Sequence, residues 1–360
     1  MSARIFTIIA ILSLLGCSEA QVQEATPHDN NTGAVDVKPR GKRLLGFGVT
    51  EGSVGYEVAF GEAKAAGIQF VELAQQWDEV ELSPGKFKSP FLKIANEFYP
   101  ASDTSLVLSI NPIDTSRLRV PEYLVDKPFD SVEVIREFNQ FVDFVFAGLP
   151  DATIIAISIG NEVDGWLADD AQKWSQYARF VAAVSKHIKT THPDIPIGVK
   201  TTWPAIVTAQ KSEIGVVNRV AGAIMVTYYP LNDDFTVRPP TVVGNELNQL
   251  VQIAGDKPVF LLETGYPSGS DNKSSEKQQA EFIEAIFAAW DQHADSIHMI
   301  NFVWLYDMSK ADVKSMTNYY ALKTPAFASF LATLGLKTHK GKDKQAFASV
   351  KKYAEVRGWK

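Results

Sequence analysis

The sequence predicts a single (β/α)8 barrel, the TIM barrel of the α/β class. After Arg43, short β-branched or apolar runs alternate with amphipathic stretches of helical period, which is typical of parallel strands joined by crossover helices. Eight such runs can be counted. No GxGxxG or GxxxxGK turn follows the first run, as would be usual in an open doubly wound sheet. A closed eight-stranded barrel therefore fits better than an open sheet.

The elements are expected in regular order along the chain. The eight expected strands are LLGFGVT (44–50), IQFVELA (68–74), TSLVLSI (104–110), TIIAISIG (153–160), PIGVKTT (196–202), AIMVTYY (223–229), PVFLLET (258–264) and IHMINFVWL (297–305). The clearest helical stretches lie at 132–147, 171–190, 245–254 and 275–293. A last helix at 325–334 is expected to close the cycle.

Residues 1–16 have the pattern of a bacterial lipoprotein signal peptide. Arg4 precedes an apolar run at 5–15, which is too short for a confident membrane span, and a small residue stands directly before Cys17. The four residues that end in Cys17 resemble a lipobox, which implies that Cys17 is lipidated. We therefore expect an exported protein anchored at the cell envelope, at the outer membrane. The alternative is an ordinary signal peptide with an incidental cysteine.

The rest of the chain divides into three parts. The polar stretch 17–42 has no helical or strand period and predicts a flexible tether. Residues 43–336 are expected to form the barrel, and the charged tail 337–360 to form a helix packed on its outside. One large domain of this kind is usual, because such barrels use about 250 residues.

The composition excludes several classes of function. The net charge is −7, and Lys and Arg are scattered along the chain, which argues against nucleic acid as a partner. One cysteine allows no internal disulfide and no thiolate cluster, and neither an HExxH nor a GxSxG motif occurs. We therefore expect no metal and no cofactor, and a monomer by default.

Charged and aromatic residues end four of the expected strands. In (β/α)8 barrels the reacting groups lie at the carboxyl ends of the strands, because the βα loops build that face. The residues at these ends are Asn161 and Glu162 after the fourth strand, Tyr228 and Tyr229 on the sixth, Glu263 on the seventh and Trp304 on the eighth. They are expected to converge at one rim.

The period of the fourth strand indicates which way Glu162 points. Ala156, Ser158, Gly160 and Glu162 share one face, and the isoleucines share the other, so the small residues can line the interior and leave room for a ligand. By the same alternation Val259, Leu261 and Glu263 are expected to share a face of the seventh strand. The two strands lie across the barrel, so the two carboxylates can face each other.

A pair of facing carboxylates is the arrangement that hydrolysis of a glycosidic bond requires. One carboxyl group donates a proton to the leaving oxygen, and the other attacks the anomeric carbon or activates water. A neighbouring negative charge raises the pKa of the acid and keeps it protonated. We therefore predict Glu162 as the acid/base and Glu263 as the nucleophile. The alternative is that each is a rim carboxylate in a surface ion pair.

The segments ISIGNEV and FLLETGYPSG resemble the fourth-strand and seventh-strand motifs of the large clan of retaining (β/α)8 glycosidases. The resemblance implies that Glu162 is the acid/base and Glu263 the nucleophile of a double displacement. It also implies that Asn161 hydrogen-bonds the sugar 2-hydroxyl, that Tyr228 or Tyr229 hydrogen-bonds the nucleophile, and that Trp304 lies under the sugar.

Within that clan the motifs point in different directions. GNEV and ETGYPSG resemble endo-β-1,3-glucanases, whereas VTYYPLN with PVFLLETGYP resembles endo-β-1,4-galactanases. The arginine-rich first-strand pattern expected of the galactanases is absent. The resemblance therefore implies an endo-acting hydrolase of a β-linked polysaccharide of galactan or glucan type, with hydrolysis or transglycosylation left open.

Further binding residues can be expected at the same rim. Flat apolar rings stack on the C–H face of a pyranose, and the tryptophans that follow strands at the rim are Trp77, Trp166, Trp203 and Trp304. Capping of the barrel core is the alternative for each of them. Asn111 closes the third strand and is a polar candidate. An alternative function of another class is that of a non-catalytic surface lipoprotein that binds carbohydrate. A protein that only binds carbohydrate has no need of two carboxylates that repel each other.

Overall fold

The computed structural model describes residues 37–208 and 211–360. The predicted signal peptide, the lipidation residue Cys17 and most of the predicted tether lie outside these residues. The last residues of the predicted tether are not free of the barrel, because the Arg40 amide donates to the Arg357 carbonyl at 2.8 Å and Arg43 donates to the carbonyls of Lys38 and Pro39. The barrel domain therefore begins a few residues before its predicted start at 43.

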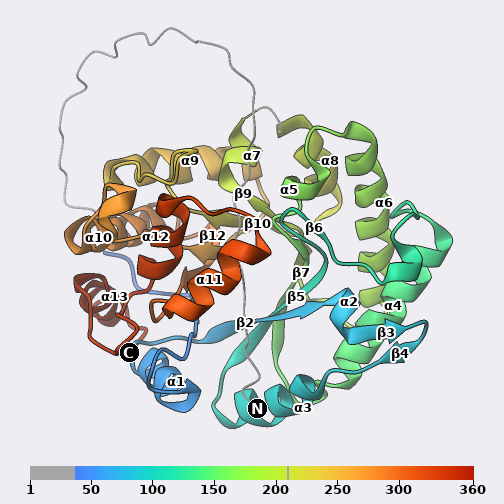
Figure 1. Cartoon of the computed structure of the whole chain (residues 1–360), viewed down its shortest axis with the longest axis horizontal. Helices are drawn as coiled ribbons and strands as arrows, with labels where there is room; N and C mark the ends of the chain where they lie inside the picture. The colour runs from blue at the N-terminus through green and yellow to red at the C-terminus, as the bar shows by residue number, and fades with distance from the viewer. Residues whose placement is uncertain (1–36, 209–210) are drawn as a thin grey trace, which may run out of the picture.

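Parallel strands form a ring around the centre of the molecule (Figure 1). The strands are β1 (Leu44–Gly48), β2 (Phe70–Gln76), β5 (Ser105–Asp114), β7 (Ile154–Asn161), β8 (Ile197–Gly198), β9 (Lys200–Thr202), β10 (Ile224–Tyr228), β11 (Val259–Thr264) and β12 (Ile297–Val303). Their order is β8-β7-β5-β2-β1-β12-β11-β10-β9. Because β8 and β9 are separated only by Val199, they occupy one position and bring the two ends of the sheet together. The predicted (β/α)8 barrel is thus confirmed.

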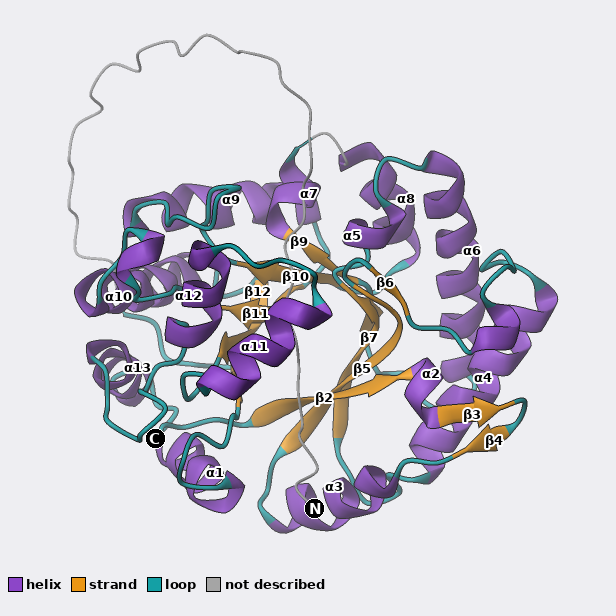
Figure 2. Cartoon of the chain, in the orientation of Figure 1, coloured by secondary structure: helices purple, strands orange, loops and turns teal. Residues whose placement is uncertain are grey.

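Helices surround the strands, as the colouring by secondary structure shows (Figure 2). The outer helices are α1 (Tyr56–Ala65), α3 (Pro90–Ala101), α4 (Val132–Ala147), α6 (Ala171–Ile188), α8 (Lys211–Val220), α9 (Val243–Ala254), α10 (Glu276–Gln292) and α13 (Gln345–Glu355). Three of the strongest helical patterns begin at side-chain caps, in which the oxygens of Ser131, Asp170 and Ser275 accept backbone amides of the first turn. No helix among the described residues is long and apolar enough to cross a membrane.

Shorter elements lie in the loops that follow the carboxyl ends of the strands. They are α2 (Trp77–Val80), the hairpin of β3 (Glu81–Ser83) and β4 (Lys86–Phe87), β6 (Arg117–Leu118), which pairs antiparallel with β5, α5 (Asp164–Leu167), α7 (Trp203–Val207), α11 (Lys310–Tyr319) and α12 (Pro325–Thr333).

The helix that closes the outer ring is α13, not the predicted helix at 325–334. α13 packs against α10, and the Trp359 indole beyond it donates to Gln69 at 3.0 Å and stacks on Trp290 with ring centroids 4.7 Å apart. α12 lies instead in a second cluster with α11, next to Tyr229 and Trp304. The charged tail is therefore part of the barrel, because its apolar face fills the gap between the last helix and the first.

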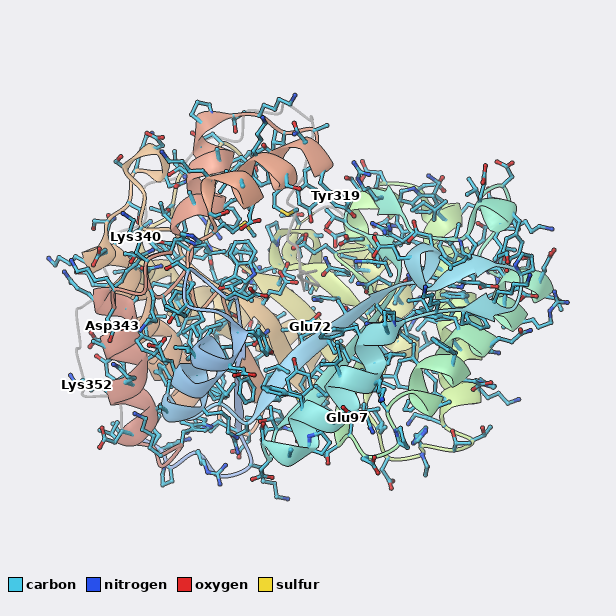
Figure 3. All side chains as sticks on the ribbon, turned by 60° about the horizontal axis from the view of Figure 1, so that its bottom comes forward. Glu72, Glu97, Tyr319, Lys340, Asp343 and Lys352 are labelled. Carbon is cyan, nitrogen blue, oxygen red and sulfur yellow. The ribbon has the colours of Figure 1, made fainter. Side chains whose placement is uncertain are left out.

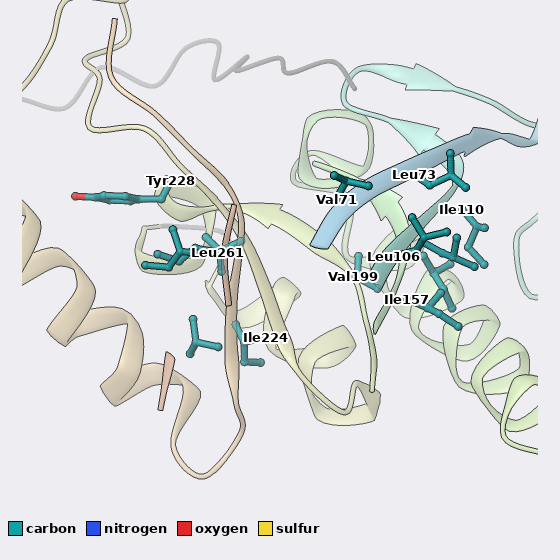
Figure 4. Packing of buried hydrophobic residues seen from close by; sticks show 14 of the residues in the cluster. Val71, Leu73, Leu106, Ile110, Ile157, Val199, Ile224, Tyr228 and Leu261 are labelled. Carbon is teal, nitrogen blue, oxygen red and sulfur yellow. The ribbon is translucent and has the colours of Figure 1, made fainter. Parts of the chain in front are cut away.

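Side chains alternate between two hydrophobic layers. Large residues such as Leu261 and Ile157 face the helices (Figure 4), whereas Phe70, Ala156 and Met225 belong to a small cluster inside the ring. On β7 this is the predicted arrangement. On β11 it is not, because Val259 and Leu261 face outward while Phe260 and Leu262 line the interior.

A β-bulge explains how Glu263 still reaches the interior. The register of β11 shifts against both neighbours, between Val226 and Thr227 of β10 and between Leu261 and Thr264 of β11 opposite β12. A bulge inserts one extra residue and reverses the alternation beyond it. The sequence therefore predicted the direction of Glu263 correctly from an alternation that the strand does not follow.

Candidate active site

Glu162 stands at a sharp bend after β7. Gly160 has φ 89° and Glu162 has φ 42°, so the chain leaves the strand through the left-handed region. The carboxyl group is fully buried. The Thr115 hydroxyl donates to Glu162 Oε2 at 3.2 Å, and the Thr227 hydroxyl donates to Oε1 at 2.7 Å. Two neutral donors therefore hold this carboxyl group at the mouth of the barrel.

Glu263 is also fully buried and is held at both oxygens. Lys200 Nζ donates to Oε1 at 2.8 Å, and the Tyr229 hydroxyl donates to Oε2 at 3.1 Å. Burial raises the pKa of Glu263 to about 7 and Glu72 adds to the increase, whereas Lys200 and Tyr229 act in the opposite direction. Glu263 can therefore change its charge in the physiological range.

The two glutamates are bound by side chains from one strand and its end. Thr227 and Tyr229 are two residues apart on β10 and its end, so both face the interior and their Cα atoms are about 7 Å apart. One donates to Glu162 and the other to Glu263. Burial raises the pKa of Tyr229 well above its ordinary value, and the charges of Glu263 and Glu162 add to this increase. The described geometry thus brings the two predicted carboxylates to one place.

Asn161 is part of a second polar chain. Its amide nitrogen donates to Asp114 Oδ1 at 2.9 Å, and the Tyr319 hydroxyl donates to Asp114 Oδ2 at 2.8 Å. Arg119 in turn donates to the Tyr319 hydroxyl at 2.8 Å. Burial raises the pKa of Asp114, against the lowering effects of Asn161 and Tyr319. This chain links the strand that bears Glu162 to α11.

The mouth of the barrel is covered. Trp304, 2% exposed, packs in one cluster with Tyr229, Met316, Tyr320 and Phe330. Figure 2 shows α11 in front of the strands β11 and β12, and Figure 3 shows Tyr319 on this segment and Glu72 within the barrel. The α11 segment therefore separates the buried glutamates from solvent.

Three of the predicted binding residues lie elsewhere. Tyr228 faces outward, where its hydroxyl donates to Glu246 at 2.7 Å and its ring packs against Trp203 (Figure 4). The Trp203 indole donates to the Glu246 carbonyl. Trp77 packs against Phe138 and donates to Glu81 at 2.7 Å. The prediction that these side chains bind substrate is corrected: they fill the layer between strands and helices.

The other two candidates have different positions. Trp166 is half-buried on α5, where it packs against Phe129 and beneath Lys173. Asn111 is buried near the end of β5 and accepts from the Ser109 hydroxyl at 2.9 Å, on the interior face. Asn111 therefore lies on the side of the strand that faces the site, whereas Trp166 has no described contact with either glutamate.

Sequence reasoning missed the charged residues inside the strands. Glu72 lies within FVELA and Lys200 within GVKTT, and both are buried. Charged side chains are almost never fully buried unless they are paired, so a charge inside an apolar strand was the available signal. Asp114 and Tyr319 had no comparable signal, because they lie on a strand extension and a helix that were not predicted. Among the described residues, no group of three or more His, Cys, Asp or Glu side chains is arranged to hold a metal ion.

No family model matches this chain, and no curated protein matches its sequence. Several solved structures share its fold. The exo-β-1,4-mannosidase Op5Man5 from Opitutaceae bacterium strain TAV5 is 16% identical with a TM-score of 0.66, over 88% of this chain and 59% of its own. A GH5_18 variant from Streptomyces cattleya, in complex with Manb1-4GlcNAc, is 14% identical with a TM-score of 0.68, over 88% and 81%.

A third similar structure is the β-glycosidase BGL167, at 12% identity and a TM-score of 0.58 over 82% of this chain and 84% of its own. This chain spans 59% of the length of Op5Man5 and most of the length of the other two. At such identities the likeness shows the fold alone, a (β/α)8 barrel that this chain shares with these structures.

Proposed function

We propose that this chain is a retaining β-glycoside hydrolase in which Glu162 is the acid/base and Glu263 the nucleophile. The observation that supports it most directly is the bridge of Thr227 and Tyr229, which binds both buried glutamates from one strand. The barrels of similar fold that are named as mannosidases and glycosidases add weight to this chemistry.

The proposed reaction has two steps. In the first, Glu263 attacks the anomeric carbon, the glycosidic C–O bond breaks, and the leaving oxygen takes the proton of Glu162. In the second, Glu162 removes a proton from water, and the water oxygen displaces Glu263 from the anomeric carbon. In this proposal Tyr229, which donates to Glu263, orients the nucleophile, Asn161 binds the 2-hydroxyl, and Trp304 lies under the sugar ring.

The proposed substrate is a β-linked polysaccharide or oligosaccharide. Galactan and glucan come from the sequence motifs, and mannose-containing glycosides from the proteins of similar fold. Endo action on a polymer needs a cleft that is open at both ends, whereas Trp304 and both glutamates are at most 2% exposed. Oligosaccharides therefore belong in the test beside the polymers.

The test is reducing-sugar release by the purified full chain on β-1,4-galactan, β-1,3-glucan, β-mannan and xylan, with their oligosaccharides and aryl glycosides. We expect turnover by the wild type and none by Glu263→Gln. NMR of the first product should show the β anomer, since double displacement retains configuration. An α anomer would contradict the retaining mechanism, and binding without turnover in the wild type would favour a carbohydrate-binding lipoprotein.

We also propose that the protein is exported and held at the cell envelope by acyl chains on Cys17. The Cys17→Ala protein should then lose its place in the membrane fraction of the producing bacterium. A membrane fraction equal to that of the wild type would contradict the lipid anchor.

A further inference from the structure

Lys200 lies inside the barrel between two glutamates. Its side chain is completely buried, and Nζ lies 2.8 Å from Glu263 Oε1 and 2.6 Å from Glu72 Oε1. The two carboxylates come from β11 and β2, and the lysine from β9. One ammonium group thus crosses the interior and joins three strands.

The backbone of Lys200 is held as firmly as its side chain. Its amide donates to the Ser158 hydroxyl at 3.1 Å, and its carbonyl accepts the Val163 amide at 3.2 Å. Ser158 lies on β7, the strand that leads to Glu162, and Val163 directly follows Glu162. The position of the ammonium group relative to both glutamates of the proposed reaction is therefore set by main-chain contacts.

We propose that Lys200 is the positioning residue of the nucleophile, and that Glu72 is the counter-ion that holds Lys200 in place. This inference rests on the proposed function. The ammonium group favours the carboxylate form of Glu263 and fixes Oε1, while Tyr229 fixes Oε2. A buried charge is costly unless it is paired, so Lys200 makes an ionised Glu263 attainable in this interior.

Glu72 is needed because the charge of Glu263 disappears during the reaction. When Glu263 forms its ester with the anomeric carbon and the leaving group departs with the proton of Glu162, Glu263 becomes neutral. Without Glu72, Lys200 would then be a buried cation with no counter-ion, which is strongly destabilising. With Glu72, the ammonium group stays paired until water cleaves the ester and restores the carboxylate.

Several charged or titratable groups surround Glu263. They are Lys200 on β9, Glu72 on β2, Tyr229 after β10, Glu162 after β7 and Tyr320 after α11. Lys200 lowers the pKa of Glu263, and the charge of Glu72 raises it. Burial alone lowers the pKa of Lys200, but the charges of Glu263 and Glu72 raise it above its ordinary value, so the ammonium group stays charged.

The two substitutions should therefore move the acidic limb of kcat/KM in opposite directions. In Lys200→Met the apparent pKa of the acidic limb should rise by at least one pH unit. At pH values below that pKa, kcat/KM should then be about tenfold lower than in the wild type. In Glu72→Gln the apparent pKa of the acidic limb should fall. Deglycosylation should also slow, which would be seen as a larger burst of product with an activated aryl glycoside. Lys200→Arg should recover part of the rate.

Lys344 provides the matched control, since it is also buried and paired with Asp307 at 2.7 Å but lies outside the site. Lys344→Met should be less stable than the wild type, but the apparent pKa of the acidic limb of its kcat/KM should be unchanged. A Lys200→Met protein that loses activity by the same factor at every pH would overturn the proposal, because it would indicate a merely structural role.

A readout independent of turnover is the titration of Glu263 by carbon-13 NMR of labelled glutamate in the full chain, assigned by its loss in Glu263→Gln. The midpoint should rise in Lys200→Met and fall in Glu72→Gln. An unchanged midpoint overturns the proposal even in an active enzyme. Moved midpoints without turnover on any glycoside would instead count against the proposed function and leave the role of Lys200 in place.

Discussion

Glu263 is a residue whose environment makes folding depend on pH. Burial raises its pKa from an ordinary 4.5 to about 7, against the lowering effect of Lys200. The folded state therefore holds this proton more tightly than the unfolded state, so the contribution of Glu263 to stability is complete below pH 4.5 and is lost as pH rises to about 7. We expect the free energy of unfolding of the wild type, relative to Glu263→Gln, to fall across this window in urea titrations. A constant difference would contradict the raised pKa.

Gly160 is a residue whose missing side chain shapes the bend before Glu162. A Cβ there would lie 2.5 Å from Val163 Cγ1 and 2.6 Å from the Tyr177 hydroxyl, and φ is 89°. Gly160→Ala should cost about 1–3 kcal/mol from overpacking alone. Thermal unfolding measures the loss. The control is Gly61→Ala in α1, where no atom lies within 4 Å of the new Cβ and which should be neutral or stabilising; equal losses in both would show that the bend is not the cause.

α11 is the element that covers the site, and Tyr319 fastens it. The Tyr319 hydroxyl donates to Asp114 at 2.8 Å and accepts from Arg119 at 2.8 Å. Hydrogen bonds to charged groups contribute about 1.5–3 kcal/mol each. Tyr319→Phe should therefore open α11 more often, seen as faster amide hydrogen exchange in this helix with the exchange of the barrel strands unchanged.

The neighbouring tyrosine is the control for this experiment. The Tyr320 hydroxyl is buried and makes no hydrogen bond with the described residues. Removing a buried hydroxyl without a partner is neutral or stabilising, so Tyr320→Phe should not accelerate exchange in α11. Faster exchange in both variants would indicate that α11 is not held over the site by the hydrogen bonds of Tyr319 in particular.

At the scale of the whole molecule, the two ends of the barrel chain meet at Asp291. Arg43 from the beginning and Arg357 from the end both donate to this buried carboxylate, at 2.9 and 2.6 Å, and Arg43 lies over the rings of Trp290 and Trp359. These contacts close the outer ring between α10 and α13.

Asp291→Ala should destabilise the whole barrel, because it leaves two buried guanidinium groups without a counter-ion. Breaking a buried pair in this way costs about 3–5 kcal/mol. Thermal unfolding should show one cooperative transition at a lower temperature. The exposed pair of Lys93 and Glu97 is the comparison, and Lys93→Ala should leave the transition where it is. A small effect at Asp291, equal to that at Lys93, would contradict this role.

The sequence by itself determined the eight strands, most of the helices and the barrel. Strand runs and helical periods are local properties, and their order requires a crossover after each strand, so the (β/α)8 fold and the positions of Glu162 and Glu263 at strand ends could be predicted. What could not be predicted depends on contacts between distant segments.

Only the tertiary structure decided which neighbours surround the two glutamates. The bulge in β11 depends on pairing with β10 and β12, and it turns Glu263 to the interior after Leu262, where Tyr229 donates to it. Lys200 meets Glu72 across 128 residues of sequence, and Tyr319 meets Asp114 across 205. Such pairs have no local pattern, because burial and charge balance are properties of the closed barrel and not of any one strand.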